Sequence, residues 1–363
     1  MIVYWSMLAW IIFWWVVYNL INQNCRWKKP PFAFVAITYG YITFWTGMRS
    51  GFADTGTYIA MFNSLPSKLS EYFNSIDLAE TKSIGYEILQ VAFKQFISQD
   101  YHVWLMCIAA ISIICIVYVI YNESDSFFFS TYLFMTLLVF MWLFNGMRQF
   151  LAVAILFAAY RLIINKRMMA YVVLVLILST IHFSCVLLIP LYFIVQLRPY
   201  KFNTFAIIFG FILLCIFANP VINSLETALE GTAYSGFSTQ FVSDDGVNPI
   251  RVVVAFVPVV LAFWKREKIF NDNNRFVEIA ANMSILSACL YMFGIFTSGI
   301  IMGRLPIYCE VYNMVFLPYI IKKGFSGKEG ILLEMGAIVG YFFYFYLQSG
   351  GWYYVSDFTG IVS

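Results

Sequence analysis

The chain has 363 residues, of which 62% are hydrophobic and 11% are charged, and its formal net charge is +3. Its mean hydropathy of +0.79 lies far above that of water-soluble folds and excludes a soluble globular protein. The composition indicates a polytopic protein surrounded by a lipid bilayer, and we expect no nucleic-acid partner.

Apolar segments follow one another along the whole chain. A hydrocarbon core about 30 Å thick is crossed by about 20 helical residues, so segment length predicts the spans. We expect an all-α fold of about 10 to 12 transmembrane helices in a single membrane domain, residues 1–363. The candidate segments are 2–22, 32–48, 102–121, 127–144, 149–164, 168–181, 183–197, 203–218, 251–264, 277–298, 305–321 and 331–348.

The run from residue 127 to 164 is too long for one span, and its only charges are Arg148 and Arg161. We therefore expect two spans that meet at NGMRQ, where Gly146 permits a tight turn. Arg148 then opens the second helix, where backbone N–H groups and the helix dipole favour an anion. The alternative is a lone arginine whose charged end reaches the lipid headgroups.

Lysine and arginine collect in alternate connections, and basic connections stay in the cytoplasm. This rule predicts that the N-terminus and the C-terminus lie outside. It also requires residues 168–197 to form two short segments that meet near His182. The cytoplasmic groups are then Arg26 to Lys29, Lys166 with Arg167, Arg198 with Lys201, Lys265 to Arg275, and Lys322 to Lys328.

Arg161 is counted at the cytoplasmic end of its span, so 15 of the 22 basic residues face inward. The remaining seven fall on the outer side, against the usual bias. Three are the lysines Lys68, Lys82 and Lys94 within residues 49–101. The four arginines lie where a span meets the outer face, and an anion bound there would explain them: Arg49, Arg148, Arg251 and Arg304.

Two external loops are predicted. Residues 49–101 are too polar to span a membrane and too long for a simple connection, so we expect amphipathic helices over the outer face. In this loop the side chains of Tyr86, Leu89, Phe93 and Phe96 share one helical face. Residues 219–250 contain acidic residues and no lysine or arginine before Pro249, and we expect them to form the second external loop.

The motif RSGFADTGTY, residues 49–58, places a guanidinium, a carboxylate and hydroxyl groups together at the end of a span. Arg49 is a candidate anion clamp, with Asp54 a candidate general base beside it. The structural alternative is that Asp54 caps a helix beginning near Thr55, while Arg49 extends to the headgroups.

Two further motifs contain possible proton acceptors. Glu87 in KSIGYE could act as a base or bind a sugar, or it could be a solvated helical carboxylate. His182 in TIHFS can exchange a proton near neutral pH, or it can be a core histidine bonded to a backbone carbonyl.

The motif GRLPIYCEVY, residues 303–312, begins with Arg304 and carries Glu310 about two turns further on. A carboxylate at that depth is costly unless it is paired, so we expect a structural pairing for Glu310.

The chain contains no P-loop, GxSxG, HExxH or DxD motif, and Asp244 with Asp245 is a weak metal candidate. We expect no cofactor and no metal, because guanidinium groups can neutralise a diphosphate without a metal ion.

The order of these motifs resembles that of the EpsG-like family of polysaccharide polymerases, relatives of the Wzy-type O-antigen and capsule polymerases. The motifs are, in chain order, Arg49 with DTGTY, GYE, NGMRQ, HFS and a late GR followed by a tyrosine. The resemblance covers roughly residues 40–320. It implies a GT-C-like membrane fold in the bacterial plasma membrane, the inner membrane where there are two. Its substrates would be undecaprenyl diphosphate-linked glycans, joined at the outer face, and a chain-length regulator is a possible partner.

Under this interpretation the arginines hold the lipid diphosphate, and Asp54, with His182 and Glu87 as the other candidates, accepts the proton of the attacking hydroxyl. Substrate contacts are expected from Tyr58, Lys82, Tyr86, Gln149 and Tyr308. Two other functions remain open. One is an O-antigen ligase with a different acceptor, and the other is a transporter or flippase of lipid-linked sugars, which usually carries charges deep in several spans.

Overall fold

The computed structural model describes residues 1–76, 83–217, 220, 224, 227, 246–297, 299 and 302–363. The chain divides into two compact units. Unit 1 contains Met1–Ala158, Leu176–Phe183 and Leu332–Ser363, and unit 2 contains Ala159–Val175 and Ser184–Ile331. The predicted single domain stays a prediction, and each unit is treated separately below.

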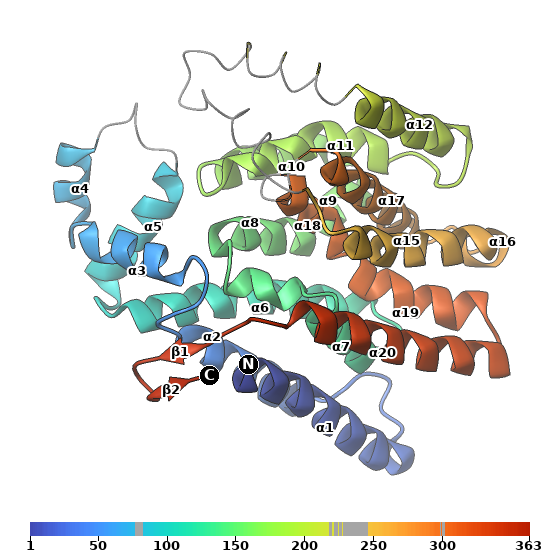
Figure 1. Cartoon of the computed structure of the whole chain (residues 1–363), viewed down its shortest axis with the longest axis horizontal. Coiled ribbons are helices and arrows are strands. Elements are labelled where there is room, and N and C mark those ends of the chain that lie inside the picture. The colour runs from blue at the N-terminus through green and yellow to red at the C-terminus, as the bar shows by residue number, and fades with distance from the viewer. Residues whose placement is uncertain are drawn as a thin grey trace. The chain divides into compact units, whose positions relative to one another are not determined.

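The described part of the chain is almost entirely helical (Figure 1). Up to Ala158 the elements are α1 (Ile2–Cys25), α2 (Phe32–Gly47), α3 (Thr55–Ser64), α4 (Leu69–Ser75), α5 (Ile84–Phe96), α6 (Tyr101–Glu123), α7 (Phe127–Thr136), the 3-10 helix η1 (Val139–Leu143) and α8 (Met147–Ala158). The later elements are α9 (Tyr160–Ile164), α10 (Met168–Ser179), η2 (Phe183–Leu187), α11 (Leu188–Val195), α12 (Phe202–Ile216), α15 (Pro249–Trp264), α16 (Arg266–Ile269), α17 (Arg275–Ile295), η3 (Met302–Arg304), α18 (Ile307–Glu310), α19 (Asn313–Gly324), α20 (Lys328–Gln348), β1 (Val355–Ser356) and β2 (Ile361–Val362).

The prediction of an all-α polytopic membrane protein is confirmed. Four of the described helices are long and apolar enough to cross a membrane: α1, α6, α17 and α20. Several predicted spans consist of two shorter helices. The segment 127–144 bends at Leu138, whose φ of 65° ends the regular helix, and the segment 149–164 divides into α8 and α9. The predicted division of 168–197 near His182 is confirmed, since α10 ends at Ser179.

Helix α6 is central to unit 1, where it packs between α2 and α8 (Figure 1). The buried face of α6 is apolar and includes Ile108, Ile113 and Ile116. Gly47 at the end of α2 permits the close approach, since a Cβ there would lie 2.6 Å from that of Met106. This packing fixes the end of α2, directly before Arg49.

Unit 2 is built around α17, which is buried along most of its length. Alanine and serine recur on this helix, at Ala280, Ala281, Ser284, Ser287 and Ala288. Small side chains let neighbouring membrane helices approach closely, and α15, α12 and α18 pack against α17.

The segment 49–101 forms α3, α4 and α5, so the prediction of helices there is confirmed. The four residues of the predicted side-chain stripe on α5 differ in burial. Tyr86 and Phe93 are buried, whereas Leu89 and Phe96 are exposed. Gln90 and Lys94 lie on the buried face together with Tyr86. They follow Tyr86 by one and two helical turns, so their side chains point to the same side of α5. Most of the predicted second loop, 219–250, lies outside the described residues.

Candidate functional site

Arg49 follows α2 and is completely buried, so it does not extend to the headgroups. Its Nε donates to Thr55 Oγ1 at 3.0 Å, Nη1 donates to the Thr46 carbonyl, and Nη2 contacts Met147 Sδ at 3.4 Å. Burial lowers the pKa of Arg49 to about 10, so the group stays cationic at neutral pH. Within the described ranges no carboxylate lies at ion-pair distance from Arg49.

Arg148 lies in the first turn of α8, as predicted, and is only partly buried. The turn before it contains Gly146 with φ +79°, a conformation that side chains with a Cβ rarely adopt. Nη1 of Arg148 donates to Ser83 Oγ at 2.7 Å. Its Nε is buried without a hydrogen-bond partner in the described part of the chain.

Two tyrosines face the guanidinium of Arg148. Its Cζ lies 5.9 Å from the ring centroid of Tyr58 and 5.8 Å from that of Tyr86. Both rings are buried and lie within electrostatic reach of Arg49. Met147 contacts Arg49 and directly precedes Arg148, so the two cations belong to one site. We call it the arginine–tyrosine cluster, formed by Arg49, Thr55, Tyr58, Ser83, Tyr86 and Arg148.

Gly85 brings the TIHFS motif against this cluster. Its N–H donates to the Thr180 carbonyl at 2.9 Å, and a Cβ at Gly85 would lie 2.0 Å from Thr180 Oγ1. Only glycine allows the start of α5 to approach this closely. His182, two residues later, is partly exposed. Tertiary packing therefore places residues of four separate sequence motifs in one region of unit 1.

The two candidate carboxylates differ in their surroundings. Asp54 stands at the N-cap position of α3, as the structural alternative predicted, but its side chain accepts no hydrogen bond from the helix N–H groups. Glu87 accepts a hydrogen bond of 2.9 Å from the Tyr72 hydroxyl. Burial and the contact with Glu87 raise the pKa of Tyr72, so this phenol remains the donor. Glu87 is therefore not simply a solvated carboxylate.

The structure describes one of two other predicted substrate residues. Gln149 follows Arg148 in α8 and is buried. Lys82 lies outside the described residues, as do Asp244 and Asp245.

Unit 2 contains the other two predicted arginines. Arg251 lies in the first turn of α15. The Asn248 side chain caps this helix, since its Oδ1 accepts a hydrogen bond of 3.0 Å from Ile250 N. Glu310 is buried in α18 and accepts a hydrogen bond of 2.7 Å from the Tyr291 hydroxyl, and Arg251 acts on it electrostatically. The carboxylate is thus stabilised by a phenol as well as by a cation.

Arg304 ends η3, three residues before α18 begins. In α18 the Tyr308 hydroxyl lies 2.9 Å from Ser184 Oγ at the start of η2. This contact links the HFS motif to the late GR motif within unit 2.

Comparison with protein families gives a match to the model described as the EpsG family over residues 32–353. The chain belongs to the EpsG family. This family comprises Wzy-like polysaccharide polymerases, so the chain has a polysaccharide polymerase-like role, that of a glycosyltransferase-like enzyme acting on lipid-linked glycans in a membrane. The resemblance inferred from the motifs is confirmed. Neither curated proteins nor solved structures give a match.

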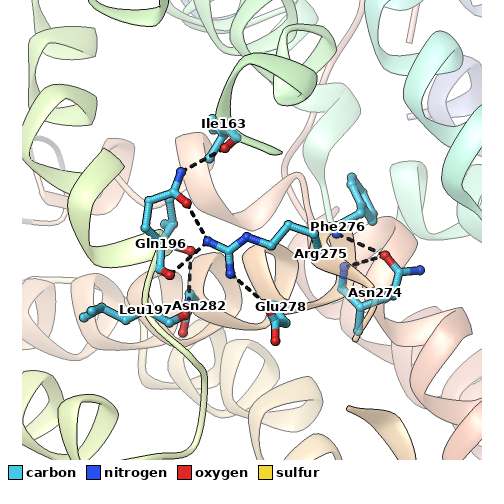
Figure 2. A network of polar contacts seen from close by, with 10 residues as sticks. Ile163, Gln196, Leu197, Asn274, Arg275, Phe276, Glu278 and Asn282 are labelled. Carbon is cyan, nitrogen blue, oxygen red and sulfur yellow. Dashed lines mark hydrogen bonds and ion pairs between the residues drawn. The ribbon is translucent and has the colours of Figure 1, made fainter. Parts of the chain in front are cut away.

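A partly buried arginine in unit 2, Arg275, provides a contrast (Figure 2). Arg275 opens α17, donates to Glu278 Oε2 at 2.6 Å and to the Gln196 carbonyl at 2.9 Å, and also contacts the Gln196 side chain. The Gln196 amide donates to the Ile163 carbonyl at 2.8 Å. Arg275 is paired with a carboxylate and joins the ends of α9, α11 and α17, so it has a structural role that the arginine–tyrosine cluster does not share.

The sequence motifs did not indicate several residues in and around the arginine–tyrosine cluster. Ser83, Thr55 and Met147 contact the arginines, and all three stood inside quoted motifs. Gln90 and Trp104 were also missed. Both amide atoms of Gln90, the Tyr86 hydroxyl and the Trp104 indole N–H are buried without hydrogen-bond partners in the described ranges. Trp104 lies against the Tyr86 ring at 5.7 Å, with its N–H outside hydrogen-bond geometry. The signal for Gln90 was its position one helical turn after Tyr86.

Proposed function

We propose that this protein joins undecaprenyl diphosphate-linked oligosaccharide repeat units into an O-antigen, capsule or exopolysaccharide. The growing chain is transferred from its lipid diphosphate to the repeat unit of a second lipid-linked substrate. The reaction takes place at the outer face of the bacterial plasma membrane and uses no metal or cofactor. The protein has a GT-C-like architecture.

The observation that carries this proposal is the pair of guanidinium groups in the arginine–tyrosine cluster. Arg49 is buried, and neither it nor Arg148 has a carboxylate at ion-pair distance among the described residues. Burying a cation without a counterion is costly, so a bound anion would stabilise this arrangement. A diphosphate matches the planar donor geometry of guanidinium groups.

Arg148 makes the direct contact in this proposal, because it is only partly buried and its Nε–H lacks an acceptor. Arg49 does not contact the diphosphate in this proposal, because Thr55 and Met147 occupy its guanidinium. It stabilises the anion through its positive charge. Both charges stabilise the negative charge that develops on the leaving diphosphate, and one such interaction contributes about 3 kcal/mol to transition-state stabilisation.

The chemical step is a displacement at the anomeric carbon of the donor chain. A hydroxyl oxygen of the acceptor forms the new C–O bond, and the bond from carbon to diphosphate oxygen breaks with its electron pair on the diphosphate. Asp54 accepts the proton of the attacking hydroxyl, since it lies one turn before Tyr58, whose ring faces Arg148. Glu87 and His182 are the other candidate bases.

Arg251 and Arg304 bind a second diphosphate in this proposal, with Tyr308 contacting the glycan. Tyr58, Tyr86, Gln149 and Lys82 contribute the remaining substrate contacts. The lipid bilayer surrounds the helices, and a chain-length regulator is a further partner.

The N-terminus and C-terminus lie outside the cell membrane in this proposal. A membrane-impermeant thiol reagent should label Phe358→Cys in intact cells and should fail to label Glu267→Cys, and both positions are exposed. The reverse pattern would invert the orientation and remove the outer-face site.

Reconstitution tests the activity directly. Purified protein in liposomes with undecaprenyl diphosphate-linked repeat units should produce a ladder of products that differ by one repeat unit. Transfer only to a lipid A core acceptor would identify a ligase. Movement of substrate between leaflets without extension would identify a flippase.

A further inference from the structure

The last residues of the chain pair with the loop that carries Arg49. We name residues 354–363, which contain β1 and β2, the tail hairpin. The Val355 carbonyl accepts hydrogen bonds from Ser50 N at 2.8 Å and Gly51 N at 3.2 Å, and Val355 N donates to the Gly51 carbonyl at 3.0 Å. These bonds hold the backbone immediately after Arg49. The EpsG family match ends at residue 353, so the tail hairpin lies beyond it.

His102 at the start of α6 connects the tail hairpin to the backbone immediately before Arg49. Its Nδ1 lies 3.1 Å from the Gly47 carbonyl oxygen, and its Nε2 lies 2.9 Å from Asp357 Oδ1. A carbonyl and a carboxylate only accept hydrogen bonds, whereas a neutral imidazole has one N–H. Both contacts are therefore hydrogen bonds at the same time only when the ring is doubly protonated, and in that form His102 and Asp357 make an ion pair.

Asp357 has further partners that orient it. Its Oδ2 accepts a hydrogen bond of 2.6 Å from the Tyr101 hydroxyl, and its backbone N donates to Ser50 Oγ at 3.1 Å. The Tyr354 hydroxyl donates to the Trp45 carbonyl at 2.8 Å. The tail hairpin thus contacts the end of α2 and the loop after it, on both sides of Arg49.

We propose that His102 and Asp357 are positioning residues for Arg49, with the tail hairpin holding the Arg49 loop in the geometry that stabilises the leaving diphosphate. This inference rests on the proposed function for its consequence in catalysis. The geometry explains why a buried cation keeps one position: Gly47 is held by His102, and Ser50 and Gly51 are held by the tail hairpin.

The test uses the full chain with His102→Gln, Asp357→Asn and the double variant. Each single variant should lower kcat about tenfold and change KM for the lipid-linked substrate less than about threefold, because a charge-assisted hydrogen bond at a partly exposed pair is lost. The double variant should be no slower than the slower single variant, as expected for two residues of one interaction. Asp357→Glu should recover part of kcat, and Glu71→Gln, an exposed carboxylate on α4, is the charge-matched control.

A second readout does not depend on activity. Met48 is buried beside Arg49, so Met48→Cys should react slowly with a maleimide while the loop is held. Labelling, followed at this peptide by mass spectrometry, should rise at least about fivefold when His102→Gln or Asp357→Asn is added.

The outcomes separate the two proposals. Faster labelling in both variants supports the positioning role even if the wild-type protein makes no polymer, and that result would contradict only the proposed function. A wild-type protein that polymerises, with both variants unchanged in kcat and in Met48→Cys labelling, would overturn the positioning role.

Discussion

Arg148 donates a hydrogen bond of 2.7 Å to the Ser83 hydroxyl across 65 positions of sequence. This contact brings NGMRQ to the start of α5. The ring centroid of Tyr86, also on α5, lies 5.8 Å from Cζ of the same guanidinium. The helix connection at NGMRQ and the start of α5, which look independent in the sequence, both contact the Arg148 guanidinium.

Replacing Arg148 by alanine should reduce polymer formation about a hundredfold, since the direct contact with the leaving diphosphate is lost. Product ladders in proteoliposomes measure the rate, and the amount of inserted protein is measured in parallel. Arg198→Ala, at an exposed position, is the matched control. Full activity of Arg148→Ala would remove the guanidinium from the mechanism.

Replacing Thr55 by valine keeps the shape of the side chain and removes the acceptor of Arg49 Nε. The buried N–H then lacks a partner, so the free energy of unfolding should fall by about 1 to 3 kcal/mol. Thermal midpoints in detergent measure the change, with Thr57→Val on the exposed side of α3 as the control. Equal midpoints for the two variants would show that Thr55 is not required to satisfy Arg49.

Alanine at Gly85 should destabilise unit 1 by about 1 to 3 kcal/mol, because its Cβ would overlap Thr180 Oγ1. Adding Thr180→Gly should restore part of the midpoint, since the overlapping atoms are removed. Gly336→Ala in α20, where a Cβ meets nothing within 4 Å, should not lower the midpoint. A stable Gly85→Ala protein would argue against the close contact.

In unit 2, Tyr291→Phe should destabilise the protein by about 1 to 3 kcal/mol, because the buried carboxylate of Glu310 loses its donor. Combining it with Glu310→Gln should cost less than the sum of the single variants, since both act on one hydrogen bond. Thermal midpoints of the four proteins form the cycle. Strict additivity would show that the two side chains are not coupled.

The stability provided by Asp357 should depend on pH. The hydrogen bond from Tyr101 is the largest cause that holds the pKa of Asp357 below its usual value. Burial opposes this effect, and the charge of His102 lowers the pKa further. A lowered folded-state pKa stabilises the protein above the ordinary aspartate pKa, and this stability is lost as the pH falls through the folded-state pKa. The midpoint difference between wild type and Asp357→Asn should therefore shrink between about pH 5 and pH 3. A constant difference would contradict the ionised contact.

The class of protein follows from the sequence alone. Apolar segments of span length and the positions of lysine and arginine are local properties, because hydrocarbon thickness and insertion charge bias act on each segment separately. The turn at Gly146, the break near His182 and the helices of residues 49–101 were all predicted in this way. The order of the motifs also indicated the EpsG family.

Tertiary structure alone decided which residues meet. The burial of Arg49, its contacts with Thr55 and Met147, and the approach of Thr180 to Gly85 join distant segments, and no local pattern specifies such contacts. The exposure of Leu89 and Phe96 was also not predictable from the sequence. Which residues of one helical face are buried depends on the neighbouring elements that cover it. The ion pair of His102 and Asp357, 255 positions apart, had no signature in the sequence, because two short polar residues acquire this role only when folding brings them together.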